Sequence, residues 1–122
     1  MFHLSLPVTA FAECLRFYEA CFEARIVMLD DDTANLFVFD GQITFHNRPD
    51  ATLTETQRRE MHFGHVVSPR RWREIRDRLR DAGRPLLKCV DPEETANRRG
   101  KLLLADPSGN LVEINSEPHA AL

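Results

Sequence analysis

The sequence of 122 residues has no long hydrophobic run, no excess of basic charge and no regular spacing of its cysteines. No apolar stretch approaches the roughly 18 residues of a membrane span, so we expect no membrane partner. The formal net charge of −3 provides no general attraction to nucleic acid. The N-terminal residues lack the basic region and long apolar stretch of a secretory signal, so we expect none.

The three cysteines show none of the spacings of a zinc site. Cys14 and Cys21 fall within one helical pattern, and their spacing separates them by roughly 10 Å along a helix axis. That separation is too large for a disulfide. We therefore predict reduced thiols and a cytoplasmic location.

The composition is that of an ordinary globular domain, with 43% hydrophobic and 29% charged residues. Residues 48–60 are polar and show no sustained apolar period, which predicts a linker or a flexible loop. We expect a single domain over residues 1–122, with a first module at about 1–47 and a second at about 61–116.

Both modules show the same succession of patterns, a strand, a helix and then three strands. The first helical period covers residues 10–22, with Thr9 as its expected N-cap. The second helix starts at Ser68-Pro69, a strong start signal, and ends at Gly83. The expected strands are 2–8, 26–29, 35–39 and 42–46 in the first module, and 61–67, 85–90, 100–105 and 111–115 in the second.

The two modules form an internal repeat. Their first strands superpose without gaps and carry a histidine at the same place, His3 and His62. The closing hairpins also correspond, with residues 40–45 matched to 108–113. In that match Phe45 stands opposite Glu113, so the first module offers no carboxylate at this position.

Glu113 is a carboxylate within an apolar strand, where it faces water, is buried at a cost, or binds a cation. A helix must cover one face of each sheet, and strand alternation places His3, His62 and Glu113 on the other face. Two imidazoles and a carboxylate form a facial triad with open coordination positions. We predict that this triad binds a divalent metal, with Fe(II) or Mn(II) favoured and zinc or nickel as alternatives.

The sequence resembles the vicinal oxygen chelate superfamily, which contains glyoxalase I, extradiol dioxygenases and the bleomycin- and fosfomycin-resistance proteins. The likeness rests on residues 2–8, 17–18 and 61–67, and most specifically on the Asp-Pro-Ser-Gly-Asn turn and strand at 106–114. It is closest to small extradiol-dioxygenase-like proteins. The resemblance implies an α+β fold of two paired βαβββ modules, forming a curved mixed sheet around a metal cleft. It also implies the same three metal ligands and a homodimer, and the cleft forms within one chain or across two.

The sequence departs from two branches of this superfamily. Glyoxalase I is similar in its ligands but has four, the fourth being a second glutamate that closes the first module. The matching position here is Phe45, or His46 if the turn differs by one residue. Ring-cleaving members use an acid–base histidine and usually a tyrosine, but Tyr18 lies in the buried stripe of the first helix. His46 is the best candidate for the catalytic base. His65 has the wrong parity for the site and is expected to pack or to support a ligand.

We predict a metal-dependent enzyme that binds a small-molecule substrate through chelating oxygens, with extradiol-dioxygenase-like activity favoured. The alternatives are a glyoxalase-like isomerase or lyase, and a non-catalytic, ligand-sequestering dimer of the bleomycin-resistance type. The arginines of the second helix alternate with acids, which indicates a solvated face with ion pairs and no nucleic-acid partner. Arg98, Arg99 and Lys101 either screen an anionic substrate or merely solubilise a turn.

Overall fold

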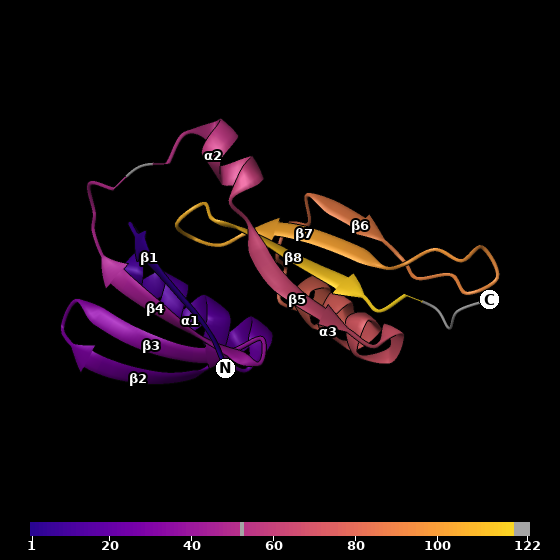
Figure 1. Ribbon diagram of the computed structural model, residues 1–122, viewed down its shortest axis with the longest axis horizontal. Coiled ribbons are helices and arrows are strands. Elements are labelled where there is room, and N and C mark those ends of the chain that lie inside the picture. The colour runs from indigo at the N-terminus through magenta and orange to yellow at the C-terminus, as the bar shows by residue number, and fades with distance from the viewer. Residues whose placement is uncertain (52, 119–122) are drawn as a thin grey trace. The chain divides into compact units, whose positions relative to one another are not determined.

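The computed structural model describes residues 1–51 and 53–118, and its elements follow the predicted strand and helix order with one added helix (Figure 1). The first half contains β1 (Phe2–Val8), α1 (Phe11–Phe22), β2 (Arg25–Asp30), β3 (Thr33–Val38) and β4 (Gly41–Asn47). The added helix is α2 (Glu55–Glu60). The second half contains β5 (Phe63–Val67), α3 (Pro69–Asp81), β6 (Lys88–Val90), β7 (Lys101–Ala105) and β8 (Leu111–Ser116).

The chain divides into two compact units. Unit one consists of Met1–Arg58 with Asp106–Asn110, and unit two consists of Arg59–Ala105 with the residues from Leu111 onward. Each unit has one four-stranded sheet, in the order β1-β4-β3-β2 or β5-β8-β7-β6. The first two strands of each sheet are parallel and the remaining pairs are antiparallel. This confirms the predicted α+β fold of paired βαβββ modules.

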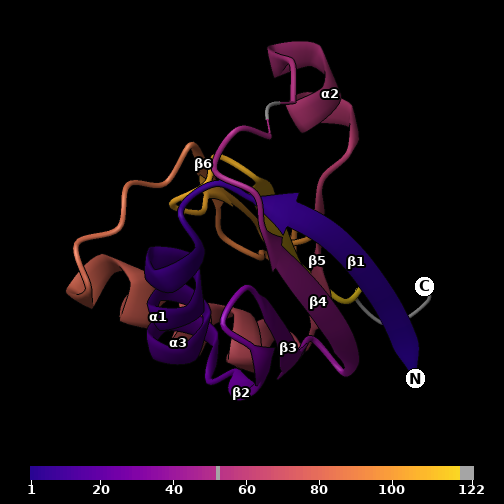
Figure 2. The ribbon, with the colours of Figure 1, turned by 90° about the vertical axis from the view of Figure 1, so that its left-hand side faces the viewer.

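Helix α1 covers one face of the unit-one sheet (Figure 2). Its buried side chains are Cys14, Phe17, Tyr18, Cys21 and Phe22. The helical period predicts a stripe of Phe11, Cys14, Leu15, Tyr18 and Phe22, but Phe11 and Leu15 are only half-buried, and Phe17 and Cys21 are buried instead. The Tyr18 ring meets the ring of Phe45 from the sheet edge-on, with 5.3 Å between centroids. Such aromatic contacts add to the free energy gained from apolar burial.

Helix α3 covers one face of the unit-two sheet through Trp72, Ile75 and Leu79. Its N-cap is Ser68, whose Oγ accepts a hydrogen bond from the Arg71 amide, as the Ser-Pro signal predicts. The Trp72 indole donates a 3.0 Å hydrogen bond to the Ile114 carbonyl of β8. None of the helices in the described part of the chain is long and apolar enough to cross a membrane.

Helix α2 was not expected, because it lies inside the predicted linker. Thr54 and Gln57 explain it, since each side chain accepts a hydrogen bond from the other residue's backbone amide, at 3.1 and 2.8 Å. This arrangement is a capping box, which satisfies free amides at a helix start. The Thr-x-x-Gln pattern was present in the sequence without an apolar stripe to accompany it.

Two further expectations about element ends were wrong. The N-cap of α1 is Ala10, which makes no side-chain cap, while the Thr9 amide binds the Ser108 hydroxyl instead, at 2.8 Å. The strand predicted at 85–90 is shorter, because β6 begins at Lys88. Pro85 has no amide hydrogen to donate to a neighbouring strand, which disfavours an earlier start.

The register of the sheets corrects the match between the closing hairpins. Strands β1 and β4 pair Ser5 with Thr44, and strands β5 and β8 pair Gly64 with Glu113. Ser5 and Gly64 are equivalent in the repeat, so the counterpart of Glu113 is Thr44 and not Phe45. The gapless match failed because the β7–β8 connection is longer than the β3–β4 turn. The first module still offers no carboxylate at this position.

Candidate metal centre

Glu113 lies on β8, on the face of the unit-two sheet opposite α3. Its neighbours Val112 and Ile114 are fully buried, and side chains alternate between the two faces of a strand. His62 directly precedes β5, and its Nε2 lies 3.0 Å from Glu113 Oε2. The structure therefore brings together two of the three predicted metal ligands.

The other nitrogen of the His62 ring is also engaged. Its Nδ1 lies 2.9 Å from the Arg59 carbonyl oxygen, which can only accept a hydrogen bond. Nδ1 therefore carries a proton, and Nε2 is the nitrogen that faces Glu113. A backbone carbonyl that fixes the tautomer and orientation of a histidine in this way is the usual support of a metal-binding imidazole.

Glu113 has two basic neighbours. Lys101 Nζ lies 3.0 Å from Oε1, while His62 contacts Oε2. Burial tends to raise the pKa of Glu113, but Lys101 and His62 outweigh it, so the pKa lies below its usual value. The side chain is 16% exposed, so solvent and a metal can still reach the carboxylate.

Gly64 allows strands β5 and β8 to pair closely beside His62 and Glu113. A β-carbon at Gly64 would collide with the main chain of Glu113, so a larger residue cannot stand at this point of the β5–β8 pairing. A hollow of about 290 Å³ adjoins it and is lined by His62, Gly64, Val66, Glu113 and Asn115, among others. The two candidate ligands therefore open onto a space large enough for an ion and part of a small molecule.

The third predicted ligand, His3, belongs to unit one. It is exposed on β1 and pairs in register with Gln42, whose amide nitrogen is 3.5 Å from its Nδ1. His46, the predicted base, has its Nε2 2.9 Å from the Ser5 hydroxyl. By alternation along β1 and β4, these side chains share the sheet face opposite α1. His65 instead lies half-buried on the α3 side of its own sheet, paired with Ile114, as its parity predicted.

The donor atoms of unit two fit a divalent metal. Two ligands at right angles around one ion lie about 3 Å apart when each bond is about 2.1 Å long. Nε2 of His62 and Oε2 of Glu113 have this separation. Within residues 1–51 and 53–118, no three His, Cys, Asp or Glu side chains lie close enough together to hold one ion. The structure thus brings two of the predicted ligands into contact within unit two, and their binding of a metal remains a prediction.

The Asp-Pro-Ser-Gly-Asn turn has a different role from that of Glu113. Asp106 is 4% exposed and accepts hydrogen bonds from the Tyr18 hydroxyl, the amides of Ser108 and Asn110, and the Asn110 side chain. Burial raises the pKa of Asp106, although these donors act in the opposite direction. The turn is therefore part of the core of unit one, and the carboxylate organises it.

Tyr18 is the partner that sequence reasoning missed. It is fully buried, and its hydroxyl donates a 2.7 Å hydrogen bond to Asp106. Burial, followed by the charge of Asp106, raises the pKa of Tyr18 well above its usual value. The phenol is therefore not available for proton transfer at a metal. The polar end of a tyrosine in an apolar helix stripe was the available signal, since a buried phenol needs a partner.

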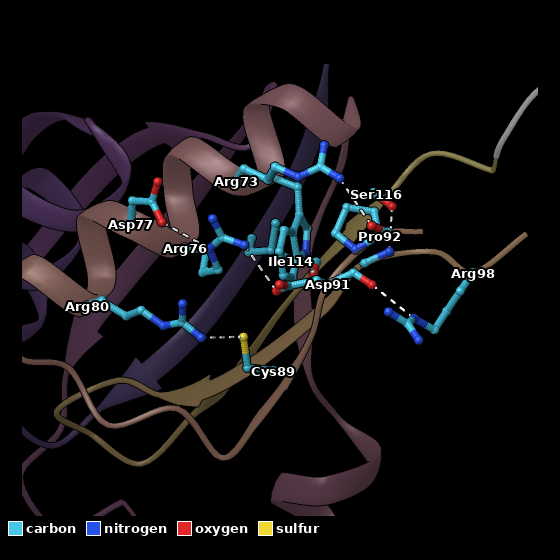
Figure 3. Close-up of polar contacts among 12 residues, drawn as sticks. Arg73, Arg76, Asp77, Arg80, Cys89, Asp91, Pro92, Arg98, Ile114 and Ser116 are labelled. Atoms are coloured by element: carbon cyan, nitrogen blue, oxygen red, sulfur yellow. Dashed lines mark hydrogen bonds and ion pairs between the residues drawn. The ribbon is translucent and has the colours of Figure 1, made fainter. Parts of the chain in front are cut away.

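Three arginines of α3 contact β6 or the segment that follows it (Figure 3). Arg76 contacts Asp77 at 3.0 Å and Asp91 at 3.1 Å, and Arg73 donates to the Pro92 carbonyl. Arg80 reaches the Cys89 sulfur at 3.5 Å. The predicted ion pairs on this helix are therefore confirmed, and several of the cations have partners within unit two.

This architecture agrees with a comparison of the sequence with models of protein families. The model of the Glyoxalase/Bleomycin resistance protein/Dioxygenase superfamily matches residues 1–114. The chain belongs to this superfamily. The resemblance predicted from the sequence is therefore confirmed. A search of curated protein sequences found no match.

Solved structures of this superfamily resemble the chain over nearly its whole length. A glyoxalase/bleomycin resistance protein/dioxygenase from Alicyclobacillus acidocaldarius is 21% identical, with a TM-score of 0.75 over 95% of this chain and 89% of that one. Lactoylglutathione lyase from Agrobacterium tumefaciens is 15% identical, with a TM-score of 0.75 over 100% and 96%. A mutant of the fosfomycin resistance protein FosX from Listeria monocytogenes, complexed with Mn(II) and dihydroxypropylphosphonic acid, is 13% identical, with a TM-score of 0.76 over 98% and 92%. At identities this low, the likeness is one of fold alone.

Proposed function

We propose that the protein is a metal-dependent enzyme that binds a small substrate through two chelating oxygens. His62 and Glu113 would hold the metal, with His3 as the third ligand. The observation that carries the proposal is the 3.0 Å separation of His62 Nε2 and Glu113 Oε2, beside a glycine and a hollow. When bound, the ion would act as a Lewis acid on the substrate oxygens.

The metal is proposed to be Fe(II) or Mn(II), with zinc or nickel as alternatives. Two imidazoles and one carboxylate are mixed nitrogen and oxygen donors, which these ions accept, and a three-ligand site leaves room for a bidentate substrate. The solved FosX structure with Mn(II) supports this choice for the superfamily. Lys101 would help hold Glu113 deprotonated, which metal binding requires.

His46 remains the proposed general base. It shares a sheet face with His3, and its hydrogen bond to Ser5 would orient the ring. Replacing His46 with Asn should leave metal binding unchanged and lower turnover by about 100-fold, the usual contribution of a general base. Equal turnover in the variant and the natural protein would remove His46 from the reaction.

Two reaction classes fit this site. Extradiol-dioxygenase-like ring cleavage is favoured by the resemblance of the sequence. A glyoxalase-like isomerase or lyase is favoured by a specific observation, because Tyr18 is buried against Asp106 and cannot assist ring cleavage. Oxygen uptake with a panel of catechols and Fe(II) would separate them, since the isomerase or lyase consumes no oxygen.

We also propose a homodimer in the cytoplasm. The edge strand β2 exposes Val27, Met28 and Leu29, and an exposed apolar edge strand is normally covered. The cysteines are free, which agrees with a reducing compartment. Analytical ultracentrifugation would test the dimer. A dimer that binds ligands but no metal would instead support the ligand-sequestering alternative.

Metal binding is the decisive test. The purified protein should bind Mn(II) or Fe(II) at one site per triad, measured by elemental analysis and calorimetry. His62→Asn and His3→Asn should each weaken binding by about 100-fold or more, because supporting residues alone account for 10- to 100-fold. Glu74→Gln, a change of an exposed acid on α3, is the control. A natural protein that binds no transition metal would contradict the proposal, and unchanged affinity in His3→Asn would remove His3 from it.

A further inference from the structure

Helix α2 is too short to be stable on its own. It has six residues, all of them described, and none of the six is buried. Isolated helices of fewer than about 12 residues are marginal in water, because few backbone hydrogen bonds offset the cost of forming the first turn. The capping box of Thr54 and Gln57 stabilises only the start of the helix. The rest of α2 therefore needs a contact outside the helix.

The Arg58 guanidinium provides this contact. Its Nη1 donates a 2.8 Å hydrogen bond to the Ser108 carbonyl, and its Nε donates to the Leu53 carbonyl at 3.3 Å. Ser108 belongs to the Asp-Pro-Ser-Gly-Asn turn, which is held in unit one by the Thr9 amide and by Asp106. Hydrogen bonds from a charged donor are stronger than neutral ones. Arg58 thus joins α2 to a buried turn 50 positions further along the chain.

Gly109 allows the guanidinium to approach this turn closely. The φ of Gly109 is +87°, in the left-handed region that favours glycine. A β-carbon at this position would also collide with Nη1 of Arg58. Any other residue would therefore strain the backbone and displace the arginine, which explains the glycine of the turn.

The carbonyl that orients His62 belongs to the same helix. It is the carbonyl of Arg59, the residue after Arg58, and it lies in the last turn of α2, where carbonyl oxygens have no partner within the helix. His62 Nδ1 bonds this carbonyl while Nε2 faces Glu113. The pairing of β5 with β8 begins at Phe63, so His62 lies just before the paired residues. The orientation of its ring therefore depends on the end of α2.

We propose that Arg58 is a positioning residue for the candidate metal centre. By fastening α2 to the 106–110 turn, it keeps the Arg59 carbonyl in place, and this carbonyl holds the His62 ring with Nε2 toward Glu113. Without the guanidinium, α2 loosens and the ring is free to turn. Residues that support a metal ligand in this way change metal affinity by about 10- to 100-fold. The role of Arg58 rests on the proposed function for metal binding alone, since the ring is already oriented without metal.

The orientation of His62 is tested first, on the metal-free protein. In the natural protein its Nδ1–H proton should be detected by NMR and be protected from exchange with water by the bond to the Arg59 carbonyl. Arg58→Gln should make this exchange about tenfold faster, which is the value of one hydrogen bond to a charged group. Arg58→Lys, which keeps a charged donor for the Ser108 carbonyl, should restore part of the protection.

Arg48→Gln is the matched control. Arg48 also belongs to unit one, and its guanidinium also donates to a backbone carbonyl, that of its neighbour Asn47 at 2.9 Å. Its replacement removes the same charge, and exchange at His62 should stay as in the natural protein. Urea unfolding of each variant checks that the fold persists. A merely structural role of Arg58 would lower the urea midpoint and leave the exchange at His62 unchanged.

Metal affinity is measured next, by calorimetry with Mn(II). Arg58→Gln should weaken binding by about tenfold, and Gly109→Ala by a similar factor, because its β-carbon displaces the same guanidinium. The double variant should lose no more affinity than the weaker single variant, since both changes break one contact. Arg48→Gln should bind Mn(II) as the natural protein does.

The outcomes separate the role of Arg58 from the proposed function. Unchanged Nδ1–H exchange in Arg58→Gln, or equal acceleration in Arg48→Gln, would overturn this role even if the metal binds as expected. Equal Mn(II) affinity in Arg58→Gln and the natural protein would overturn it as well. Faster exchange in Arg58→Gln, in a protein that binds no metal, would confirm the positioning of His62 and remove the proposed enzyme function.

Discussion

The two sheets share one topology and differ at equivalent positions. In unit one Ser5 pairs with Thr44, and the Thr44 hydroxyl donates a hydrogen bond to Asn35 at 2.7 Å. In unit two the equivalent positions are Gly64 and Glu113, and the Glu113 carboxylate contacts Lys101 and His62. A duplicated fold can therefore keep its backbone pairing in both copies while one copy alone carries a carboxylate at this position.

The largest expected effect concerns the glycine. Gly64→Ala should destabilise the protein by about 3 kcal/mol or more, because its β-carbon would collide with the Glu113 main chain and force paired strands apart. Ser5→Ala, at the equivalent place, should change the free energy of unfolding by less than about 1 kcal/mol. Urea denaturation followed by circular dichroism measures both. Equal losses would show that the two strand pairs do not differ in this way.

The next largest effect is expected for metal affinity, at Glu113 and its counterpart Thr44. Glu113→Gln should lower metal affinity by about 100-fold, or about 2.7 kcal/mol, since a neutral amide replaces the anionic ligand. Thr44→Val should leave the affinity unchanged, because Thr44 already has Asn35 as its partner. Isothermal calorimetry with Mn(II) distinguishes them. Loss of affinity in Thr44→Val would mean that the first module contributes this position to the site as well.

Removing a buried side-chain hydrogen bond from each unit should produce a smaller difference in the free energy of unfolding. Tyr18→Phe removes a hydrogen bond to the buried Asp106 carboxylate and should cost about 2 kcal/mol, the range for bonds to charged groups. Ser116→Ala in unit two removes a bond from the Gly100 amide and should cost about 1 kcal/mol. Thermal unfolding of both variants provides the comparison. A smaller loss in Tyr18→Phe than in Ser116→Ala would contradict the role given to Asp106.

The smallest effect is the response to alkaline pH. Burial, with Asp106 nearby, raises the pKa of Cys14 from 9.0 to about 12. The unfolded chain releases this proton first, so stability is full below pH 9 and falls as the pH rises toward 12. The loss at pH 10 should be about 1.4 kcal/mol. Urea unfolding at pH 8 and pH 10 measures it, and Cys14→Ala should show a shallower pH dependence. An identical dependence in that variant would assign the effect to other groups.

The sequence predicted most reliably the features that repeat at short range. Apolar residues at helical spacing placed α1 and α3, and the Ser-Pro signal placed the start of α3 at Ser68. Alternation placed Glu113 on the sheet face opposite α3. Each of these features depends on residues within a few positions of one another, so a short stretch of sequence is enough to predict it.

Features that depend on distant residues were not predictable in the same way. Tyr18 and Asp106 are 88 positions apart, and neither side chain indicates the other. The match of Phe45 with Glu113 was wrong because turn length, and not residue type, sets the strand register. The buried Oδ1 of Asn115, which has no hydrogen-bond partner in the described chain, and the collision at Gly64 appear only when strands β5, β7 and β8 are brought together. The triad with His3 remains a prediction.

The chain has one tryptophan and one tyrosine. Trp72 is buried under the unit-two sheet, with its indole on the Ile114 carbonyl, and Tyr18 is buried in unit one, with its phenol on Asp106. Fluorescence excited at the red edge of the indole band therefore reports on unit two, and in alkaline buffer the absorbance of phenolate, which forms once unfolding exposes Tyr18, reports on unit one. The natural protein thus carries an internal optical label in each half. Following both signals through one denaturant titration would show whether the halves melt in a single step or in succession, with no engineered probe.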